Sequence, residues 1–227
     1  MEPINLSDVV ASTATLINLV SPVDDELRSQ PSLLPNWSSG HVLAHIALNA
    51  EAFVRVAVSR REGHLGVMYP HGSDGRNADI AELASMPAEA ILDRLRASAV
   101  AFEDAWSQPV PEGPCAPAPG GPEFSSSTVL LRRLREVVAH GVDIGHDLMT
   151  PSDWSDRYVE ADLPLQWEAV SSRLPEGTGV AITDELNDSW TAGAGEAKPI
   201  AASRRETLAW VLDRGTIAGL PSLSSWG

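Results

Sequence analysis

The chain has 227 residues, of which 43% are hydrophobic, and its formal net charge at pH 7 is −15. This length allows one large domain or two small ones, and this hydrophobic content is enough to build a core. The acidic balance argues against nucleic acid and anionic membrane surfaces as partners, because both bind basic patches.

The single cysteine, Cys115, excludes an internal disulfide and fits a reducing compartment. Residues 1–5 lack the basic region of a signal peptide, and we expect no apolar run long enough to span a membrane. The sequence therefore predicts a cytoplasmic protein that works without a membrane segment. A monomer is the expected state.

Four segments in the first 150 residues carry apolar side chains at three- and four-residue steps, which is the pattern of amphipathic helices. They cover residues 6–29, 40–61, 85–108 and a stretch from about 127 to 149. Ser7 is expected to cap the first, Ser38 or Ser39 the second, and Ser126 or Ser127 the last. Helices of this number and length predict an N-terminal four-helix bundle over residues 1–150.

Two connections inside this region are long. Residues 64–84 are predicted to form a loop, and a loop of that length in a compact domain usually has a function. It carries Tyr69, His71 and Arg76, whose side chains suit a binding role. Residues 109–123 are rich in proline and glycine and are also predicted as loop.

The pattern changes after Pro151. We expect a helix at residues 158–173, followed by two short strands at residues 180–183 and 189–192. A third strand edge is expected at residues 198–201, and a last helix, capped by Ser203, at residues 204–214. This mixture predicts a small α+β domain over residues 151–227. The fold class of the whole chain is therefore predicted as α+β.

Glu136 and His140 are four residues apart on the fourth helix, so their side chains lie on one face, one turn apart. A carboxylate and an imidazole in this position can bind one metal ion if a third ligand comes from elsewhere. Leu134 and Val138 flank the pair, and an unpaired carboxylate beside such apolar positions would be costly. The alternative is a surface helix with an ordinary acid and a hydrogen-bonded histidine.

The second helix offers the third ligand. His45 lies within its apolar stripe, whereas His41, one turn earlier, is expected to be exposed. Two nitrogen ligands and one carboxylate form a common catalytic zinc site, although iron, nickel or cobalt could use the same ligands. Asp143, seven residues after Glu136, is either a partner that orients His140 or an ordinary surface acid.

These segments resemble a known family. Residues 34–47, LPNWSSGHVLAHIA, resemble the W-[ST]-x3-[LV]-x-x-H-[LIV] signature of DinB-like metal-dependent bundles. Residues 132–144, RRLREVVAHGVDI, resemble the R-x-R-E-x3-H-x-V-D-L segment of mycothiol-dependent maleylpyruvate isomerases. Residues 68–80 and 210–215 give shorter matches, and in the second of them Asp213 replaces the first glycine of a closing G-R-G.

The resemblance implies a DinB-like four-helix bundle joined to a smaller α+β domain. It implies one zinc ion per chain, held by His45, Glu136 and His140. Asn49 and Asp143 are expected to support these ligands. The implied cosubstrate is mycothiol, the low-molecular-weight thiol of actinobacteria.

The implied reaction is the cis–trans isomerisation of maleylpyruvate to fumarylpyruvate by reversible addition of the thiolate. Arg214 and Arg76 are the candidates for binding the two substrate carboxylates. One alternative is a mycothiol S-transferase, in which the thiol stays on another electrophile. A second is a non-catalytic binding module, against which the intact set of three ligands argues.

Overall fold

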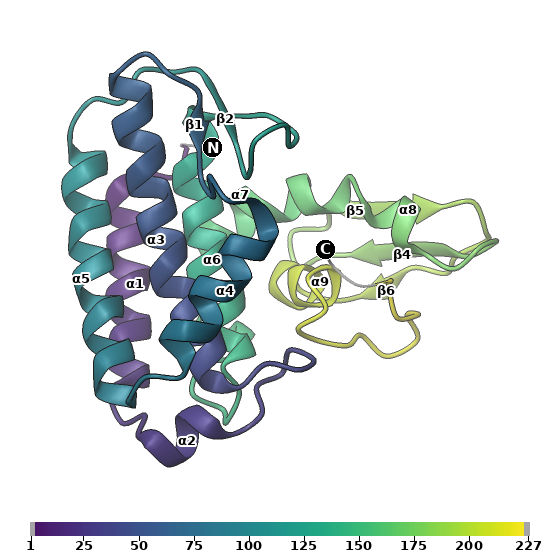
Figure 1. Ribbon diagram of the computed structural model, residues 1–227. Coiled ribbons are helices and arrows are strands. Elements are labelled where there is room, and N and C mark those ends of the chain that lie inside the picture. Colours follow the sequence, from purple (N-terminus) through teal and green to yellow (C-terminus); the bar gives the residue numbers. More distant parts are fainter. Residues whose placement is uncertain (1–2, 225–227) are drawn as a thin grey trace. The chain divides into compact units, whose positions relative to one another are not determined.

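The computed structural model of the protein describes residues 3–224. Its internal contacts divide the chain into two compact units (Figure 1). Ile4–Met149 form one unit, and the chain from Thr150 onward, together with Pro3, forms the other. The helices and small sheets give an α+β fold, as the sequence predicts.

The first unit is built on four helices that lie side by side (Figure 1). They are α1 (Leu6–Val20), α3 (Ser39–Arg61), α5 (Ala88–Ser107) and α6 (Val129–Asp143). α1 and α3 each pack against both α5 and α6, so the apolar faces of all four helices meet in one core. Phe53, Leu95 and Leu134 are among the fully buried side chains of this core.

Side-chain caps fix where the helices begin. Asn5 caps α1, because its side chain accepts from the backbone N–H of Asp8 and its own N–H donates to the Asp8 carboxylate. The prediction that Ser7 is this cap is wrong, since Ser7 lies in the first turn and donates to the Asn5 side chain. Ser38 caps α3 by accepting from the N–H of His41, as predicted.

The first predicted helix, residues 6–29, is two helices. α1 is followed by a break and then by the short α2 (Asp25–Ser29), which Asp24 caps. Pro22 lies in the break, where its missing N–H and fixed φ do not disturb a helical turn. The proline therefore lies where the chain interrupts the helix predicted over residues 6–29.

The prediction of a loop over residues 64–84 is wrong. This stretch contains β1 (Gly66–Val67) and α4 (Gly72–Ala84), and α4 packs on α3. Only Ile80 and Ala84 are buried on α4. A helix that buries so few side chains has no long apolar stripe, so its period is hard to detect in the sequence.

The second predicted loop also contributes a strand. β2 (Pro114–Ala116) pairs in parallel with β1 and antiparallel with β3 (Phe124–Ser125), which gives a three-stranded sheet in the order β1-β2-β3. Cys115 is fully buried in this sheet, and burial raises the pKa of its thiol. These properties are those of an unreactive cysteine.

α6 is shorter than predicted. The 3₁₀ turn η1 (Ser126–Thr128), capped by Ser125, precedes it, so the predicted caps Ser126 and Ser127 are wrong. The helix ends at Asp143 instead of near residue 149. Residues 145–147 have positive φ angles of 83°, 59° and 54°, and this left-handed backbone cannot continue the helix.

α3 is long and apolar enough to span a membrane by length and composition alone, so the expectation that no run reaches that length is wrong. Its mean hydropathy over the most apolar window is 1.4, and 67% of that window is buried inside the protein. A central bundle helix has the same composition as a membrane span because it is covered by apolar neighbours on most sides.

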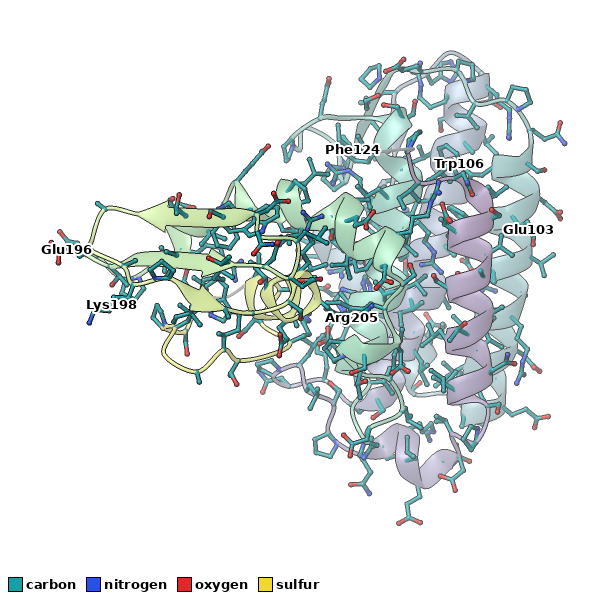
Figure 2. The ribbon with its side chains drawn as sticks, turned by 180° about the vertical axis from the view of Figure 1, so that it is seen from behind. Glu103, Trp106, Phe124, Glu196, Lys198 and Arg205 are labelled. Atoms are coloured by element: carbon teal, nitrogen blue, oxygen red, sulfur yellow. The ribbon has the colours of Figure 1, made fainter. Side chains whose placement is uncertain are left out.

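The second unit contains η2 (Pro151–Asp153), α7 (Asp156–Trp167), α8 (Val170–Arg173), β4 (Gly179–Thr183), β5 (Ser189–Gly193), β6 (Ile200–Ala201) and α9 (Arg204–Val211). β4 is central, antiparallel to β5 and parallel to β6. The predicted strands and strand edge are all present. Glu196 and Lys198, in the connection from β5 to β6, lie exposed at the tip of this unit (Figure 2).

α9 begins at its predicted cap, Ser203, but ends at Val211 and not at Arg214. Asp213, in the turn that follows, has a φ of 63°. Glycine adopts this left-handed conformation most easily, and aspartate is among the few other residues that tolerate it. The backbone therefore explains how Asp213 can replace a glycine before Arg214.

Asp184, just after β4, organises this unit. Its fully buried side chain accepts hydrogen bonds from Nε1 of Trp190 at 3.0 Å and from Nε of Arg204 at 2.7 Å. It also accepts from the backbone N–H groups of Leu186 and Asp188, both at 2.9 Å. Burial raises the pKa of Asp184, but these donors outweigh it and lower that pKa to about 2.

Replacing Asp184 with alanine should lower the free energy of unfolding by about 2–3 kcal/mol, because buried donors would lose their acceptor. Urea unfolding followed by tryptophan fluorescence measures this change. Asp188→Ala is the matched control, since that exposed carboxylate pairs with Arg204 at the surface and should cost less than about 1 kcal/mol. Equal losses in the two variants would contradict a central role for Asp184.

Candidate metal centre

The structure brings together the three residues predicted to bind a metal. His45 lies on α3, while Glu136 and His140 lie on the facing side of α6. One ligand atom from each lies within 4.8 Å of the other two. His45 is 3% exposed, so the site is anchored in the bundle.

Both imidazoles direct Nε2 toward the same carboxylate oxygen. Nε2 of His45 is 2.8 Å from Oε2 of Glu136, and Nε2 of His140 is 3.6 Å from it. The two rings meet edge to face, with centroids 4.6 Å apart and an angle of 89°. Two nitrogens and one oxygen therefore surround a common point, which is the donor set of a three-ligand zinc site.

Asp143 holds the ring of His140 from the other side. Its Oδ2 lies 2.8 Å from Nδ1 of His140, and Asp143 is 2% exposed. An ionised carboxylate only accepts, so the ring proton of neutral His140 belongs on Nδ1 and the lone pair on Nε2 is directed at Glu136. A histidine held in this way by a carboxylate is a common feature of metal sites.

Arg133 is a buried residue at this site for which the sequence interpretation assigns no role. It lies one turn before Glu136 and is 1% exposed. Its Nη1 donates to the carbonyl oxygen of Ile46 and to Oδ1 of Asn49, both at 2.8 Å. Burial lowers the pKa of Arg133 to about 10, so it remains charged at neutral pH. Its i, i+3 spacing from Glu136 places the two side chains on one face of α6, but this spacing alone does not show that Arg133 is buried.

Asn49, predicted as a supporting residue, therefore acts through Arg133, because its Oδ1 accepts from the guanidinium. It connects the third turn of α3 to α6. In the described part of the chain, Nε and Nη2 of Arg133 have no hydrogen-bond partner. The guanidinium is thus a buried positive charge near the Glu136 carboxylate.

The protonation states suit metal binding. Burial would raise the pKa of Glu136, but its hydrogen bond with His45 and the charges of both histidines and Arg133 hold that pKa well below its usual value. Burial lowers the pKa of His45 to about 4, although Glu136 acts in the opposite direction. At neutral pH the centre therefore holds an ionised carboxylate and a neutral His45.

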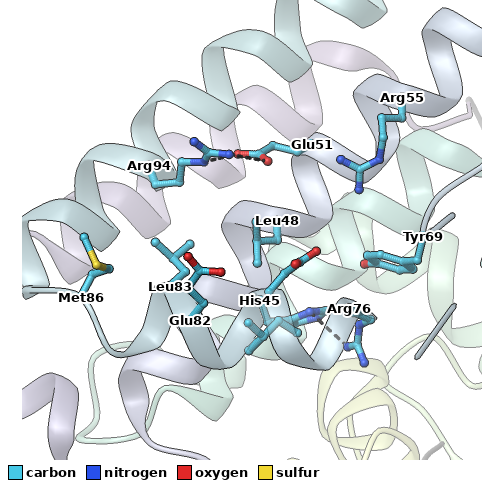
Figure 3. A pocket seen from close by; sticks show the side chains of 12 residues that line it. His45, Leu48, Glu51, Arg55, Tyr69, Arg76, Glu82, Leu83, Met86 and Arg94 are labelled. Carbon is cyan, nitrogen blue, oxygen red and sulfur yellow. Dashed lines mark hydrogen bonds and ion pairs between the residues drawn. The ribbon is translucent and has the colours of Figure 1, made fainter. Parts of the chain in front are cut away.

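Arg76 lies beside His45, and Tyr69 lies beside Arg76 (Figure 3). Nη2 of Arg76 is 3.2 Å from Nδ1 of His45, and the guanidinium lies 5.6 Å from the centre of the Tyr69 ring. Burial raises the pKa of the Tyr69 hydroxyl, which stays protonated at neutral pH. Arg214 belongs to the second unit, where its Nη1 donates to the carbonyl oxygen of Leu212.

The metal-free protein should lose about 2 kcal/mol of unfolding free energy between pH 7 and pH 5. The pKa of His45 is about 4 in the folded chain and 6.5 in the unfolded chain. Between pH 7 and pH 5 the imidazole of His45 therefore takes up a proton in the unfolded state but stays neutral in the folded state. Lowering the pH over this interval consequently favours unfolding. Glu136 titrates below this range and contributes little. Urea unfolding in the presence of a chelator measures the loss.

His45→Asn is the control for this prediction, because asparagine cannot take up the proton. Its unfolding free energy should change much less between the two pH values. An equally large loss in His45→Asn would assign the pH dependence to other groups.

Comparisons with known proteins bear on the family and the fold of this chain. The sequence profile of the mycothiol maleylpyruvate isomerase N-terminal domain matches residues 9–145. A search of curated proteins gives no match. The fold is similar to two solved structures, each 22% identical, over 97% of this chain and 95% of theirs.

One of these is the crystal structure of the mycothiol-dependent maleylpyruvate isomerase, with a TM-score of 0.84. The other, with a TM-score of 0.83, is a mutant of that isomerase in which a histidine is replaced by alanine. At this identity the two structures show the fold alone, and the family follows from the profile, which covers more than half of the chain. The resemblance noted in the sequence is confirmed: the chain belongs to the mycothiol maleylpyruvate isomerase family, a family of enzymes.

Proposed function

We propose that this chain is a zinc- and mycothiol-dependent isomerase that converts maleylpyruvate to fumarylpyruvate. The observation that carries the proposal is the set of three ligand atoms within 4.8 Å, contributed by two facing helices of a chain of this family. Its partners would be small molecules, namely the thiol and the substrate. The cytoplasm and a monomeric state remain predictions.

His45, Glu136 and His140 would hold one zinc ion, and their donor atoms fit that ion. Two of the three are imidazole nitrogens, which suit zinc and also iron or nickel, so the metal must be identified by measurement. When bound, zinc would lower the pKa of a thiol at its open position and so supply the nucleophilic thiolate at neutral pH.

The surrounding residues would keep these ligands in position. Asp143 holds the proton on Nδ1 of His140, so the lone pair on Nε2 can bind the metal. Arg133 places a positive charge beside Glu136 and favours its ionised form. Each of these residues therefore supports the ligand state that a metal requires.

Arg76 and Arg214 are the proposed binding groups for the substrate carboxylates, because a guanidinium matches a carboxylate in geometry and charge. Arg76 now donates to Nδ1 of His45. A ring nitrogen that binds a metal carries no proton, so binding through Nε2 would require the proton of His45 to be on Nδ1. In that state Nδ1 could no longer accept a hydrogen bond from Arg76. The guanidinium would then be available to the substrate. The role of Arg214 follows from the family resemblance.

The chemistry is addition followed by elimination. The thiolate adds to the activated cis double bond of maleylpyruvate, and the electron pair moves to the neighbouring carbonyl group as an enolate. The former double bond is now single and rotates. When the enolate collapses it expels the thiolate and leaves the trans double bond of fumarylpyruvate, so the thiol is regenerated.

The purified protein should contain about one zinc ion per chain, measured by plasma mass spectrometry. His45→Ala and Glu136→Ala should each lose most of it, because two protein ligands bind zinc far more weakly than three. His41→Ala is the matched control on the same helix and should keep its zinc. A metal-free wild-type protein with undiminished activity would refute the zinc site.

Incubating the protein with mycothiol and maleylpyruvate should produce fumarylpyruvate, followed by ultraviolet absorbance and chromatography. Arg214→Ala should lower kcat/KM by about 100-fold with its zinc retained, since one charged contact to the substrate is lost. A stable thioether in place of fumarylpyruvate would favour a mycothiol S-transferase. No reaction in the zinc-loaded protein would favour a binding module.

A further inference from the structure

Arg214 lies in the turn that directly follows α9, in the second unit (Figure 1). Its backbone N–H donates to the carbonyl oxygen of Ala209 at 2.7 Å, and the N–H of Asp213 donates to that of Trp210 at 3.1 Å. These two hydrogen bonds form a Schellman motif, which ends many helices. The position of Arg214 therefore depends on how this end of α9 is closed.

The residue before Arg214 makes this turn harder to form. A Schellman motif places that residue in the left-handed conformation, and Asp213 has a φ of 63° there. Glycine adopts this conformation without a steric penalty, whereas a Cβ atom opposes it. The turn is therefore less stable by itself than the same turn with glycine, so a contact from outside the turn has more to contribute.

Arg173, the last residue of α8, supplies such a contact. Its Nη1 donates to the carbonyl oxygen of Val211, the last residue of α9, at 2.5 Å. The final carbonyl groups of a helix lack partners within the helix and carry partial negative charge, which suits a guanidinium. Arg173 thus binds a terminal carbonyl group that the two hydrogen bonds of the turn do not use.

Two further hydrogen bonds keep Arg173 in this position. Its Nε donates to the carbonyl oxygen of Ser224 at 3.0 Å, and its own carbonyl oxygen accepts from the N–H of Ser224 at 2.9 Å. Its Nη2 is buried and has no hydrogen-bond partner within residues 3–224. The guanidinium therefore depends on two backbone carbonyl groups, and a change of rotamer would lose both of them.

Charge adds to this contact. Burial lowers the pKa of Arg173, and the Asp213 carboxylate acts in the opposite direction because it attracts the guanidinium. Asp213 is exposed, so water weakens the attraction and the hydrogen bond to Val211 is the main contact. Arg214 lowers the pKa of Arg173 further, which indicates that the two guanidinium groups are near each other.

We infer that Arg173 is a positioning residue for Arg214: it holds the end of α9, keeps the Schellman turn closed and so presents the Arg214 guanidinium to a substrate carboxylate. The inference rests on the proposed function, because substrate binding by Arg214 is part of that proposal. Arg173 acts through the backbone of the turn and not by contact with the substrate.

The test is a double-mutant cycle in the full, zinc-supplied chain, measured as kcat/KM for maleylpyruvate with mycothiol. Arg173→Met should lower kcat/KM about tenfold, because the turn loses a hydrogen bond to the end of α9. In the Arg214→Ala background the same change should have no further effect, since no guanidinium is left to position. Asp213→Gly should restore most of the activity of Arg173→Met, because glycine closes the turn without help.

Hydrogen exchange gives a readout that does not depend on activity. In Arg173→Met the backbone amides of Asp213 and Arg214 should exchange at least about tenfold faster, while those of β4 should keep their wild-type rates. Arg205→Met is the matched control, because Arg205 lies in the first turn of α9 and donates to backbone carbonyl groups away from the Arg214 turn. It should change neither kcat/KM nor the exchange at the turn.

An equal loss of kcat/KM from Arg173→Met with and without Arg214 would overturn this inference and leave the proposed function intact. Unchanged exchange at Asp213 and Arg214 would do the same. If Arg173→Met does not fold, Arg173→Lys takes its place in the cycle and should show the same pattern with smaller changes, because lysine keeps the charge and a donor group. A wild-type chain without isomerase activity would overturn the proposed function, and this inference with it.

Discussion

The contact between α3 and α6 is the constraint on which the rest of the candidate site depends. Arg133 reaches from α6 to the backbone of Ile46 and to the side chain of Asn49, and it does so fully buried. Ile46 follows His45 directly, and Glu136 is one turn beyond Arg133. This one cation therefore fixes the register in which the imidazole of one helix faces the carboxylate of the other. Removing a buried charge from such a network is expected to be costly.

The contact between α3 and α6 also sets the charges of the side chains at the candidate metal centre. A carboxylate enclosed by a protein normally resists ionisation, yet Glu136 lies near a permanent cation and two imidazoles that favour its charged form. His45 is kept neutral by burial, and His140 is oriented by Asp143. The bundle thus maintains an ionised carboxylate and a neutral His45 before any cation arrives, and only the ring proton of His45 would change its position on binding.

Much of this arrangement could be predicted from the sequence, because it depends on short-range spacing. Glu136 and His140 share a face by helical periodicity, and the bundle helices have clear apolar stripes. Three features could not be predicted. α4 buries too few side chains to show a helical period in its apolar residues. The end of α6 depends on the residues with left-handed backbone that follow it. Arg133 is buried only because α3 supplies hydrogen-bond acceptors for it. Each of these depends on partners that are distant in the sequence.

The early end of α6 has one further consequence. Because the helix stops at Asp143, His140 lies in its last turn, where the unpaired carbonyl groups give the helix a partial negative charge. Two of the carbonyl oxygens here are used by other segments, since Leu33 donates to Asp143 and Ser39 donates to Ile144. A cation bound by His140 would be stabilised by the dipole of the helix that carries it. A helix continued to residue 149 would have placed His140 in its interior, without this contribution.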